Sequence, residues 1–130
     1  MTIAIDRIDH LVLTVRDLDA ALHFYELVLG ARIVPPPSGQ GPTAIAFGRQ
    51  KINLHVAGKE FEPKATHPTV GAGDFCLITD QPIETVIAHL EECGVAPELG
   101  PVPRFGALGR MMSVYFRDPD GNLVEVAKYE

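Results

Sequence analysis

Two histidines and a glutamate are the residues of this chain whose types and positions could bind a metal ion. His10, His55 and Glu125 stand in or beside apolar, β-branched runs that predict strands. Two imidazoles and a carboxylate converging from three strands form a typical open transition-metal site, which leaves positions for water or substrate. Asp74, at the start of another predicted strand, is either a further ligand, a residue that supports the ligands, or a local turn residue.

These candidates follow an internal repeat. Segment 10–30 aligns with segment 74–94 without a gap, and each copy reads as a strand, a helix and a glycine. Segment 46–55 aligns with segment 115–125 if the second turn holds one extra residue. The alignment places His10 opposite Asp74 and His55 opposite Glu125. Because each copy alone would leave a sheet edge and an apolar face uncovered, we expect the two copies to pack together.

The elements that must position these residues are read from periodicity and turn residues. In the first copy we expect strands at 7–15, 31–34, 43–47 and 51–56, a helix from the Asp17 cap to Gly30, and a loop at 35–42. In the second we expect strands at 74–79, near 97, at 111–117 and at 122–127, a helix at 82–92, and a loop at 100–109.

The fold class that follows is α+β. Two βαβββ modules, at about 7–56 and 73–128, are joined by a polar linker at 57–72 that Phe61 could anchor. Together they are expected to form a curved eight-stranded incomplete barrel within a single domain, residues 1–130.

Bulk properties exclude several classes of protein. The net charge of −6 and the scattered positions of the 11 Lys and Arg residues argue against a nucleic-acid partner. No apolar run approaches the roughly 20 residues of a membrane span, and the amino terminus lacks the pattern of a signal peptide. We therefore expect a cytoplasmic protein with no membrane partner, whose Cys76 and Cys93 are reduced.

Nucleophilic catalysis has little support in the sequence. No serine stands in a Gly-x-Ser-x-Gly turn, no glycine-rich phosphate loop opens a helix, and neither cysteine has an evident neighbouring histidine. Glu125 is harder to dismiss, because an acid inside the apolar run 123–126 must face water or be paired. A strand histidine such as His10 has the plainer alternative of a hydrogen-bonded interior residue.

Four residues are candidates for holding a substrate: Arg104, Ser113, Tyr115 and Arg117. Arginine recognises carboxylates through two parallel hydrogen bonds. Arg104 stands between prolines and glycines, whereas Arg117, beside Asp118, has the alternative role of bracing a hairpin.

Three segments of the chain resemble the vicinal oxygen chelate superfamily. They are Asp9-His-Leu-Val-Leu-Thr-Val-Arg-Asp-Leu, Phe24-Tyr-Glu-Leu-Val-Leu-Gly and the closing Tyr115-Phe-Arg-Asp-Pro-Asp-Gly-Asn-Leu-Val-Glu. This superfamily includes glyoxalases, bleomycin-binding proteins and extradiol dioxygenases. Segments 53–55, 58–65 and 100–104 look most like the branch that holds glyoxalase domain-containing protein 5 and its bacterial relatives. At the fifth strand, where many members supply histidine, this chain has Asp74 or Phe75.

The resemblance implies that His10, His55 and Glu125 bind one divalent ion, which would be Mn, Zn, Ni or Fe(II). The expected activity is a lyase or isomerase step in which two neighbouring substrate oxygens are chelated and an oxyanion is stabilised, with Glu125 and Tyr115 as catalytic residues. One alternative is Fe(II) extradiol-type dioxygenase chemistry. Another is a metal-free protein that sequesters a small molecule such as a drug. The resemblance also implies a homodimer.

Overall fold

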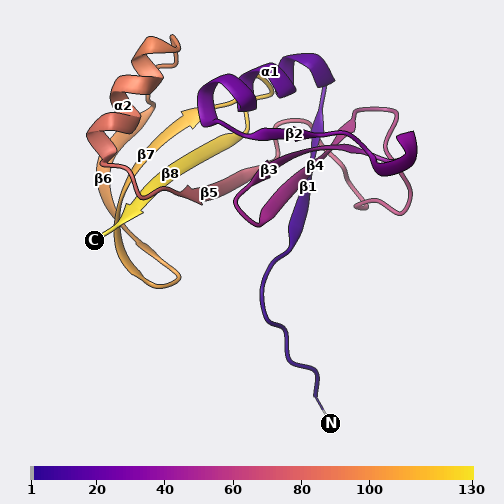
Figure 1. Cartoon of the computed structure of the whole chain (residues 1–130), viewed down its shortest axis with the longest axis horizontal. Coiled ribbons are helices and arrows are strands. Elements are labelled where there is room, and N and C mark those ends of the chain that lie inside the picture. The colour runs from indigo at the N-terminus through magenta and orange to yellow at the C-terminus, as the bar shows by residue number, and fades with distance from the viewer. Residues whose placement is uncertain (1) are drawn as a thin grey trace. The chain divides into compact units, whose positions relative to one another are not determined.

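The computed structural model describes residues 2 to 130 and divides into two compact units, Met1–Pro68 and Thr69–Glu130. Each unit has the order strand, helix, and three more strands, so the predicted α+β class with two βαβββ modules is confirmed (Figure 1). The boundary between the units lies inside the segment that the sequence indicates as a linker.

The first unit is a four-stranded mixed sheet in the order β1-β4-β3-β2. Its elements are β1 (His10–Val15), α1 (Leu18–Leu29), β2 (Arg32–Val34), a short 3₁₀ turn (Pro37–Gly39), β3 (Thr43–Phe47) and β4 (Gln50–Val56). β1 pairs with β4 in parallel, and the other pairs are antiparallel. β1 is therefore an edge strand of this sheet.

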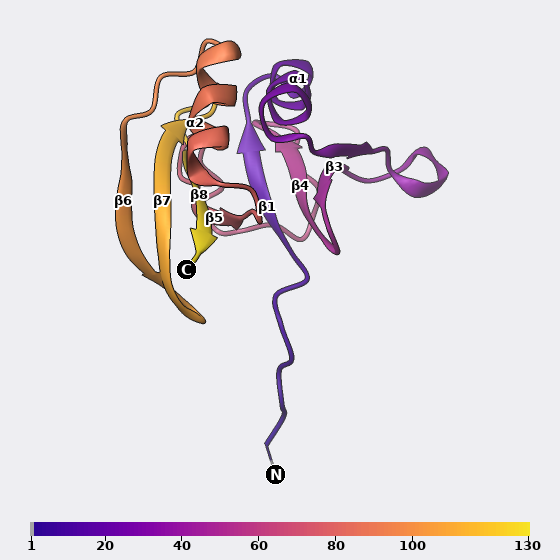
Figure 2. The same cartoon turned by 60° about the vertical axis from the view of Figure 1, so that its left-hand side comes forward.

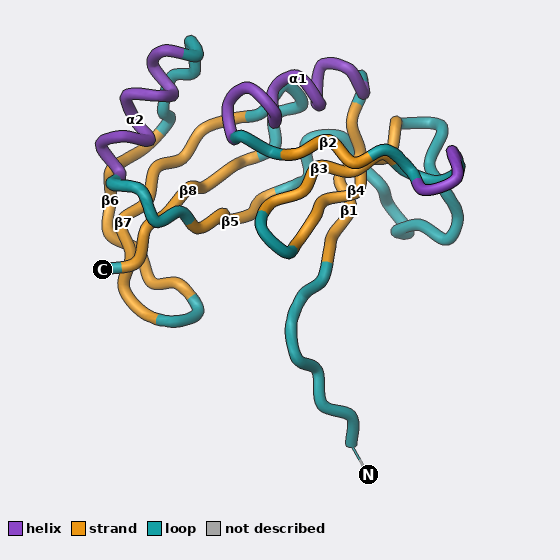
Figure 3. Tube along the Cα trace, viewed as in Figure 1, coloured by secondary structure: helices purple, strands orange, loops and turns teal. Residues whose placement is uncertain are grey.

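Helix α1 begins and ends where the sequence indicates. The Asp17 side chain accepts a hydrogen bond from the backbone N–H of Ala20 at 3.1 Å, and Gly30 ends the helix at φ 65°. The helix buries Tyr25 and contacts β2, β3 and β4, across one face of the sheet (Figure 3). The first three residues of β1, His10 to Val12, are exposed, and the last three, Leu13 to Val15, are buried.

The second unit repeats this arrangement with the sheet order β5-β8-β7-β6. Its elements are β5 (Asp74–Ile78), α2 (Ile83–Glu92), β6 (Leu99–Gly106), β7 (Gly109–Arg117) and β8 (Leu123–Tyr129). β5 pairs with β8 in parallel, as β1 does with β4. Helix α2 buries Ile83 and Leu90 and contacts β7 and β8.

The predicted loop at 100–109 is wrong, because most of it forms β6. Pro101 and Pro103 lack a backbone N–H and argued against a strand, but β6 is the edge of its sheet, where half of the N–H groups need no partner. The ladder with β7 is irregular between Leu99 and Val102, next to the first proline. The pattern of residues alone could not reveal this edge position.

Seven of the eight strands lie where they are expected, and the eighth, expected near residue 97, is β6 at Leu99–Gly106. Within residues 2–130 no ladder joins one sheet to the other. Residues 2–9 lie outside both sheets and form an extended arm that leads into β1 (Figure 2). Neither α1 nor α2 is long and apolar enough to cross a membrane, and the part of the chain described contains no other α-helix.

Candidate active site

One face of the second unit's sheet gathers most of the predicted catalytic and substrate-binding residues. Glu125 on β8 is level with Tyr115 on β7 and with Cys76 on β5. Side chains of residues that are level in adjacent strands point to the same face of a sheet. By the same parity Ser113 on β7 and Arg104 on β6 lie on this face. We call these five residues the Glu125 face.

Arg104 and Tyr115 are in direct contact on the Glu125 face. The Nε–H of Arg104 donates to the Tyr115 hydroxyl at 2.9 Å, and the guanidinium carbon lies 5.5 Å from the centre of the Tyr115 ring. The Nη1 of Arg104 donates to the carbonyl of Pro103 at 2.9 Å. The cation is thereby held over the ring, which leaves the tyrosine O–H able to donate to another group.

Two polar atoms of the Glu125 face are buried without a hydrogen-bond partner among the described residues. They are Oε2 of Glu125 and Oγ of Ser113, whose residue is fully buried. Buried polar groups are nearly always paired, and an unpaired carboxylate oxygen is expensive. A carboxylate oxygen with open lone pairs is a suitable ligand for a divalent cation or an acceptor for a substrate proton.

Cys76 is the neighbour of Glu125 on β5. Cys76 is exposed as a residue, but partial burial of its thiol raises the thiol pKa to about 11, and the charge of the Glu125 carboxylate and its hydrogen bond with the thiol add to the shift. The thiol therefore stays protonated near neutral pH and is no nucleophile there. Its position beside the glutamate was not recognised from the sequence.

Arg117 lies on the same face of the sheet, but its guanidinium is hydrogen-bonded to residues outside the Glu125 face. Its Nε and Nη2 donate to the two carboxylate oxygens of Glu98 at 3.0 Å each, and its Nη1 donates to the carbonyl of Gly121 at 3.2 Å. Hydrogen bonding to Arg117 holds the pKa of the Glu98 carboxyl below its ordinary value. Arg117 thus braces the β7–β8 turn, which is the alternative that the sequence left open.

Asp74 lies at the exposed start of β5, level with Leu123. A buried turn network fixes this start, because the Oδ1 of Asn122 accepts from the backbone N–H of Gly73 at 2.7 Å. Asn122 in turn donates from Nδ2 to Asp118 at 2.8 Å. The turn predicted at Asp118 to Gly121 therefore connects β7 and β8 and also holds the adjacent strand in register.

In the first unit, His10 and His55 lie on neighbouring strands but not at the same level. His10 is level with Lys51, and His55 is level with Thr14. The two levels are four residues apart, and this separation corresponds to about 13 Å along the strands. The sheet does not bring the two imidazoles together, so their joint action as ligands stays a prediction.

The surroundings of the two histidines also differ. His10 is exposed, and its Nδ1 lies 2.8 Å from a carboxylate oxygen of Asp9, which leaves Nε2 available. A carboxylate on the second ring nitrogen is the usual support of a metal-binding histidine. His55 is buried and meets Phe61 edge-on, with ring centres 5.5 Å apart. Phe61 thus anchors the linker, as expected.

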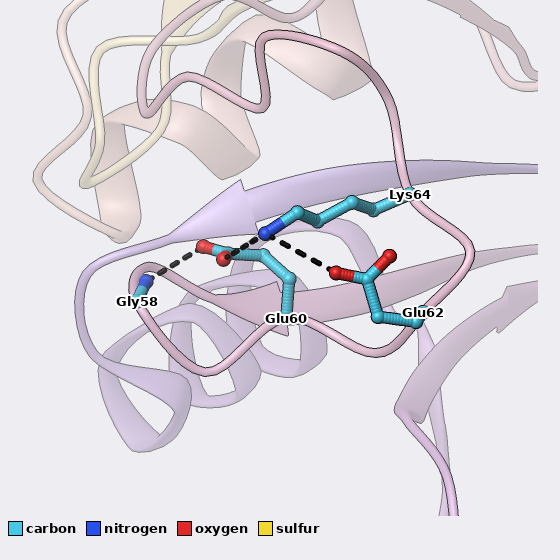
Figure 4. Close-up of polar contacts among 4 residues, drawn as sticks. All are labelled: Gly58, Glu60, Glu62 and Lys64. Carbon is cyan, nitrogen blue, oxygen red and sulfur yellow. Dashed lines mark hydrogen bonds and ion pairs between the residues drawn. The ribbon is translucent and has the colours of Figure 1, made fainter.

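The linker segment that covers His55 is held by an ion-pair cluster (Figure 4). Glu60 accepts a hydrogen bond from the backbone N–H of Gly58 at 2.6 Å, and Lys64 lies 3.4 Å from Glu60 and 3.6 Å from Glu62. These contacts lower the pKa of Glu60, chiefly through the Gly58 hydrogen bond. The segment is a structured turn, which explains how Phe61 keeps its place against the imidazole.

The equivalence of His55 with Glu125 is wrong, because the two ladders assign that position to Asn53. In the first unit Val12 is level with Asn53, and in the second Cys76 is level with Glu125. Since His10 corresponds to Asp74, Val12 corresponds to Cys76, and Asn53 then corresponds to Glu125. The sequence contains evidence for the correspondence of Asn53 with Glu125, because the triplets 52–54 and 124–126 are both apolar–polar–apolar. The Oδ1 of Asn53, like the Oε2 of Glu125, is buried without a partner among the described residues.

Two further findings concern groups of reactive side chains. Within residues 2–130 no three His, Cys, Asp or Glu side chains are grouped closely enough to hold a metal ion. The expectation that neither cysteine neighbours a histidine is wrong for Cys93, whose Sγ lies 3.6 Å from Nε2 of His89. The two residues are four apart on and beside α2, a spacing that brings side chains together on a helix.

Comparisons with known proteins agree with this architecture. The family model described as Glyoxalase/Bleomycin resistance protein/Dioxygenase superfamily matches residues 7–126. Virulence protein STM3117 of Salmonella typhimurium (strain LT2) is 52% identical over 125 residues, which cover 96% of this chain and 85% of that protein. Its crystal structure superposes with a TM-score of 0.94 at 51% identity, covering 98% of this chain and all (100%) of that one.

Two other relatives are similar over most of this chain. Glyoxalase domain-containing protein RDO1 of Mycosarcoma maydis is 45% identical over 128 residues, which cover 98% of this chain and 71% of that protein. The crystal structure of lactoylglutathione lyase from Agrobacterium tumefaciens is 31% identical with a TM-score of 0.71, and the match covers 94% of this chain and 92% of that one.

Proposed function

Because the chain belongs to the glyoxalase/bleomycin resistance protein/dioxygenase superfamily, we propose that it is a divalent-metal-dependent enzyme of the lyase or isomerase type. Its substrate is a small molecule with two neighbouring oxygens. The observation that carries this proposal is the buried Oε2 of Glu125, which has no hydrogen-bond partner among the described residues. We expect the enzyme to act in the cytoplasm as a homodimer.

The proposed ligands of the ion are Glu125, His10 and a residue of β4. Glu125 offers an unpaired carboxylate oxygen, and His10 offers Nε2 while Asp9 holds its other nitrogen. For the β4 ligand, His55 is the residue predicted from the sequence, but the repeat favours Asn53, whose Oδ1 is also unpaired. When bound, a divalent cation acts as a Lewis acid that stabilises negative charge on the substrate oxygens.

The residues of the Glu125 face supply the remaining chemistry. Glu125 is also the proposed general base: with Oε2 on the ion, the other oxygen of its carboxylate, Oε1, accepts the proton from the substrate. The Tyr115 hydroxyl, which already accepts from Arg104, donates its own proton to a substrate oxygen. The guanidinium of Arg104 and the hydroxyl of Ser113 orient an anionic or hydroxylated part of the substrate. Arg117 is left out of this role because Glu98 and Gly121 occupy it.

The experiment that tests this proposal is elemental analysis of protein purified without added metal. The parent is expected to hold one divalent ion per chain, and His10→Ala and Glu125→Ala are expected to lose most of it. His55→Ala and Asn53→Ala identify the β4 ligand, because only one of them should lose the ion. Equal metal content in the parent and in all four variants would refute metal binding by these residues.

Two alternative functions would give different results when the same protein preparation is analysed. Fe(II) dioxygenase chemistry on a catechol would show iron and uptake of oxygen, whereas a lyase or isomerase would show no oxygen uptake. A metal-free binding protein, as part of the family name suggests, would keep its full affinity for a ligand after treatment with a chelator.

A further inference from the structure

Lys51 and Arg32 place two cations in one row across the sheet of the first unit. Lys51 on β4 is level with Ala46 on β3, and Ala46 is level with Arg32 on β2. Since residues that are level in adjacent strands point to the same face of a sheet, the three side chains share one face. His10 on β1 is level with Lys51 and lies on this face too. We call Lys51, Ala46 and Arg32 the basic row.

Both cations of the basic row lack a partner. Neither the ammonium of Lys51 nor the guanidinium of Arg32 forms a hydrogen bond or an ion pair within residues 2–130. Several other cations of the chain pair with carboxylates, namely Arg7, Lys64, Arg110 and Arg117. The pKa of Asp9 is lowered first by its hydrogen bond with His10, and Lys51 makes the smallest of the contributions to that shift. The donors of both cations are therefore available to a ligand.

The strands that carry the basic row contain no acid. Residues 27–59, which include β2, β3 and β4, hold four Lys or Arg residues and no Asp or Glu, although the whole chain has a net charge of −6. One of the four, Arg49, lies in the turn between β3 and β4, next to the end of the sheet where the basic row lies. Cations gathered without acids give a locally positive potential on an acidic protein. An anion is therefore attracted to this part of the molecule.

The spacing of the basic row suits one small anion. Adjacent strands are about 4.8 Å apart, so the Cα atoms of Lys51 and Arg32 are separated by about 10 Å across Ala46. The methyl group of Ala46 is too short to keep the two longer side chains apart, so both are able to contact an oxyanion that lies above it. Lysine supplies a compact charge, and the planar fork of arginine matches the oxygens of a carboxylate or a phosphate.

We propose that the basic row binds an oxyanion, a carboxylate or a phosphate, that the small-molecule substrate carries. His10, a proposed ligand of the ion, is level with Lys51, and their Cα atoms are about 5 Å apart on adjacent strands. The substrate is then an organic acid or a phosphate ester whose two neighbouring oxygens lie beyond its anionic group. This inference rests on the proposed function in naming the ligand as the substrate, but the binding of the anion itself requires no metal.

The test follows the binding of inorganic phosphate and of malonate, a dicarboxylate, to protein freed of metal by a chelator and then dialysed. At constant ionic strength set with sodium chloride, the backbone amide signals of Ala46 and Lys51 in NMR spectra should shift and saturate with at least one of the two anions. Malonamide, the uncharged analogue of malonate, should cause no shift. Tighter binding of phosphate would identify the substrate as a phosphate ester, and tighter binding of malonate would identify it as a carboxylic acid.

Three variants, each of which removes one positive charge, separate the basic row from the net charge of the protein. Lys51→Met and Arg32→Met should each raise the Kd of the bound anion by about tenfold, because each removes a charged hydrogen-bond donor. Lys59→Met is the matched control, since Lys59 is an exposed lysine of the same acid-free segment but lies outside the sheet, and its Kd should be that of the parent. Lys51→Arg keeps the charge and should bind the anion nearly as the parent does.

Three results would each overturn the proposal: no saturable shift with either anion, a malonamide shift equal to that of malonate, or an equal rise in Kd for all three charge-removing variants. Metal content keeps this test apart from that of the proposed function. Lys51→Met should hold as much metal as the parent, whereas His10→Ala should lose the ion and keep its affinity for the anion. An anion that binds to a protein without a metal site would refute the proposed enzymatic function alone.

Discussion

Asn53 and Glu125 hold the same position in the two repeats of this chain. Each lies on the last strand of its unit, level with the third residue of that unit's first strand, Val12 and Cys76 respectively. Each also has a side-chain oxygen that is buried without a partner among the described residues. Unpaired buried oxygens destabilise a fold, and two at equivalent positions support the proposal that both positions bind a ligand.

The substitution Asn53→Asp should separate metal binding from stability. A carboxylate at this buried position is costly without a cation, so the variant should be less stable than the parent in a chelator by about 1–3 kcal/mol. With Mn²⁺ or Zn²⁺ added, its melting temperature should rise more than that of the parent, because a ligand that binds the folded state stabilises it. Thermal unfolding with and without metal measures both effects. If Asn53→Ala responds to metal as strongly as Asn53→Asp does, the side chain at position 53 does not reach the ion.

Glu125→Gln should increase the reactivity of Cys76. The pKa of this thiol is raised to about 11, first by burial and then by the Glu125 carboxylate, so the thiolate is about one part in a thousand at pH 8. Removing the negative charge lowers the pKa and should speed alkylation by iodoacetamide several-fold. Peptide mass spectrometry can follow Cys76 and use Cys93 in the same sample as the reference. An unchanged Cys76 rate would mean that burial alone sets the pKa.

Arg117→Met should raise the pKa of Glu98 toward its ordinary value. In the parent, hydrogen bonds from Arg117 lower this pKa. A folded-state pKa below the unfolded one contributes stability that is present above the unfolded pKa and is lost as the pH falls through the folded one. The variant should therefore lose less stability than the parent on acidification below about pH 4.5. An NMR titration of the Glu98 carboxyl gives the pKa directly, and the effect should weaken in high salt because both groups are exposed.

Gly100→Ala should destabilise the second unit by about 2 kcal/mol or more. A Cβ at this position would lie 2.6 Å from the carbonyl oxygen of Ser113, and the residue has φ 116°. Gly109→Ala is the matched control, because it too has a positive φ, 139°, but its Cβ would meet nothing within 4 Å. Denaturation in urea should show the larger loss for Gly100→Ala. Equal losses would mean that the backbone angle, and not the close approach to β7, sets the cost.

The elements that were predicted correctly are those whose signals are local. Asp17 and Gly30 mark the two ends of α1, and both caps form hydrogen bonds only with residues close to them in the chain. The turn at Asp118 to Gly121 is likewise local, since the backbone N–H groups of Asp120 and Asn122 donate to the Asp118 side chain. Tyr115, Ser113 and Glu125 were each singled out from the sequence as candidate site residues, and the strand register places all three on one face of the sheet.

What could not be predicted depends on the neighbours that a strand acquires in the sheet. β6 tolerates Pro101 and Pro103 because it is an edge strand, and its position in the order β5-β8-β7-β6 is decided by pairing. The level of His55 relative to His10 is set by the register of β1 against β4. A shift of two residues keeps every side chain on its face, so the apolar pattern cannot detect it.

The sequence by itself therefore determined the duplication, the α+β class, the caps and the turns. These properties follow from periodicity and from residues that are neighbours in the chain. Only the tertiary structure decided which residues are level across strands: Glu125 beside Tyr115 and Cys76, Asn53 in place of His55, and Arg117 bound to Glu98. The physical reason is that hydrogen-bonded ladders join residues far apart in the chain, and their register adjusts to packing that no local pattern records.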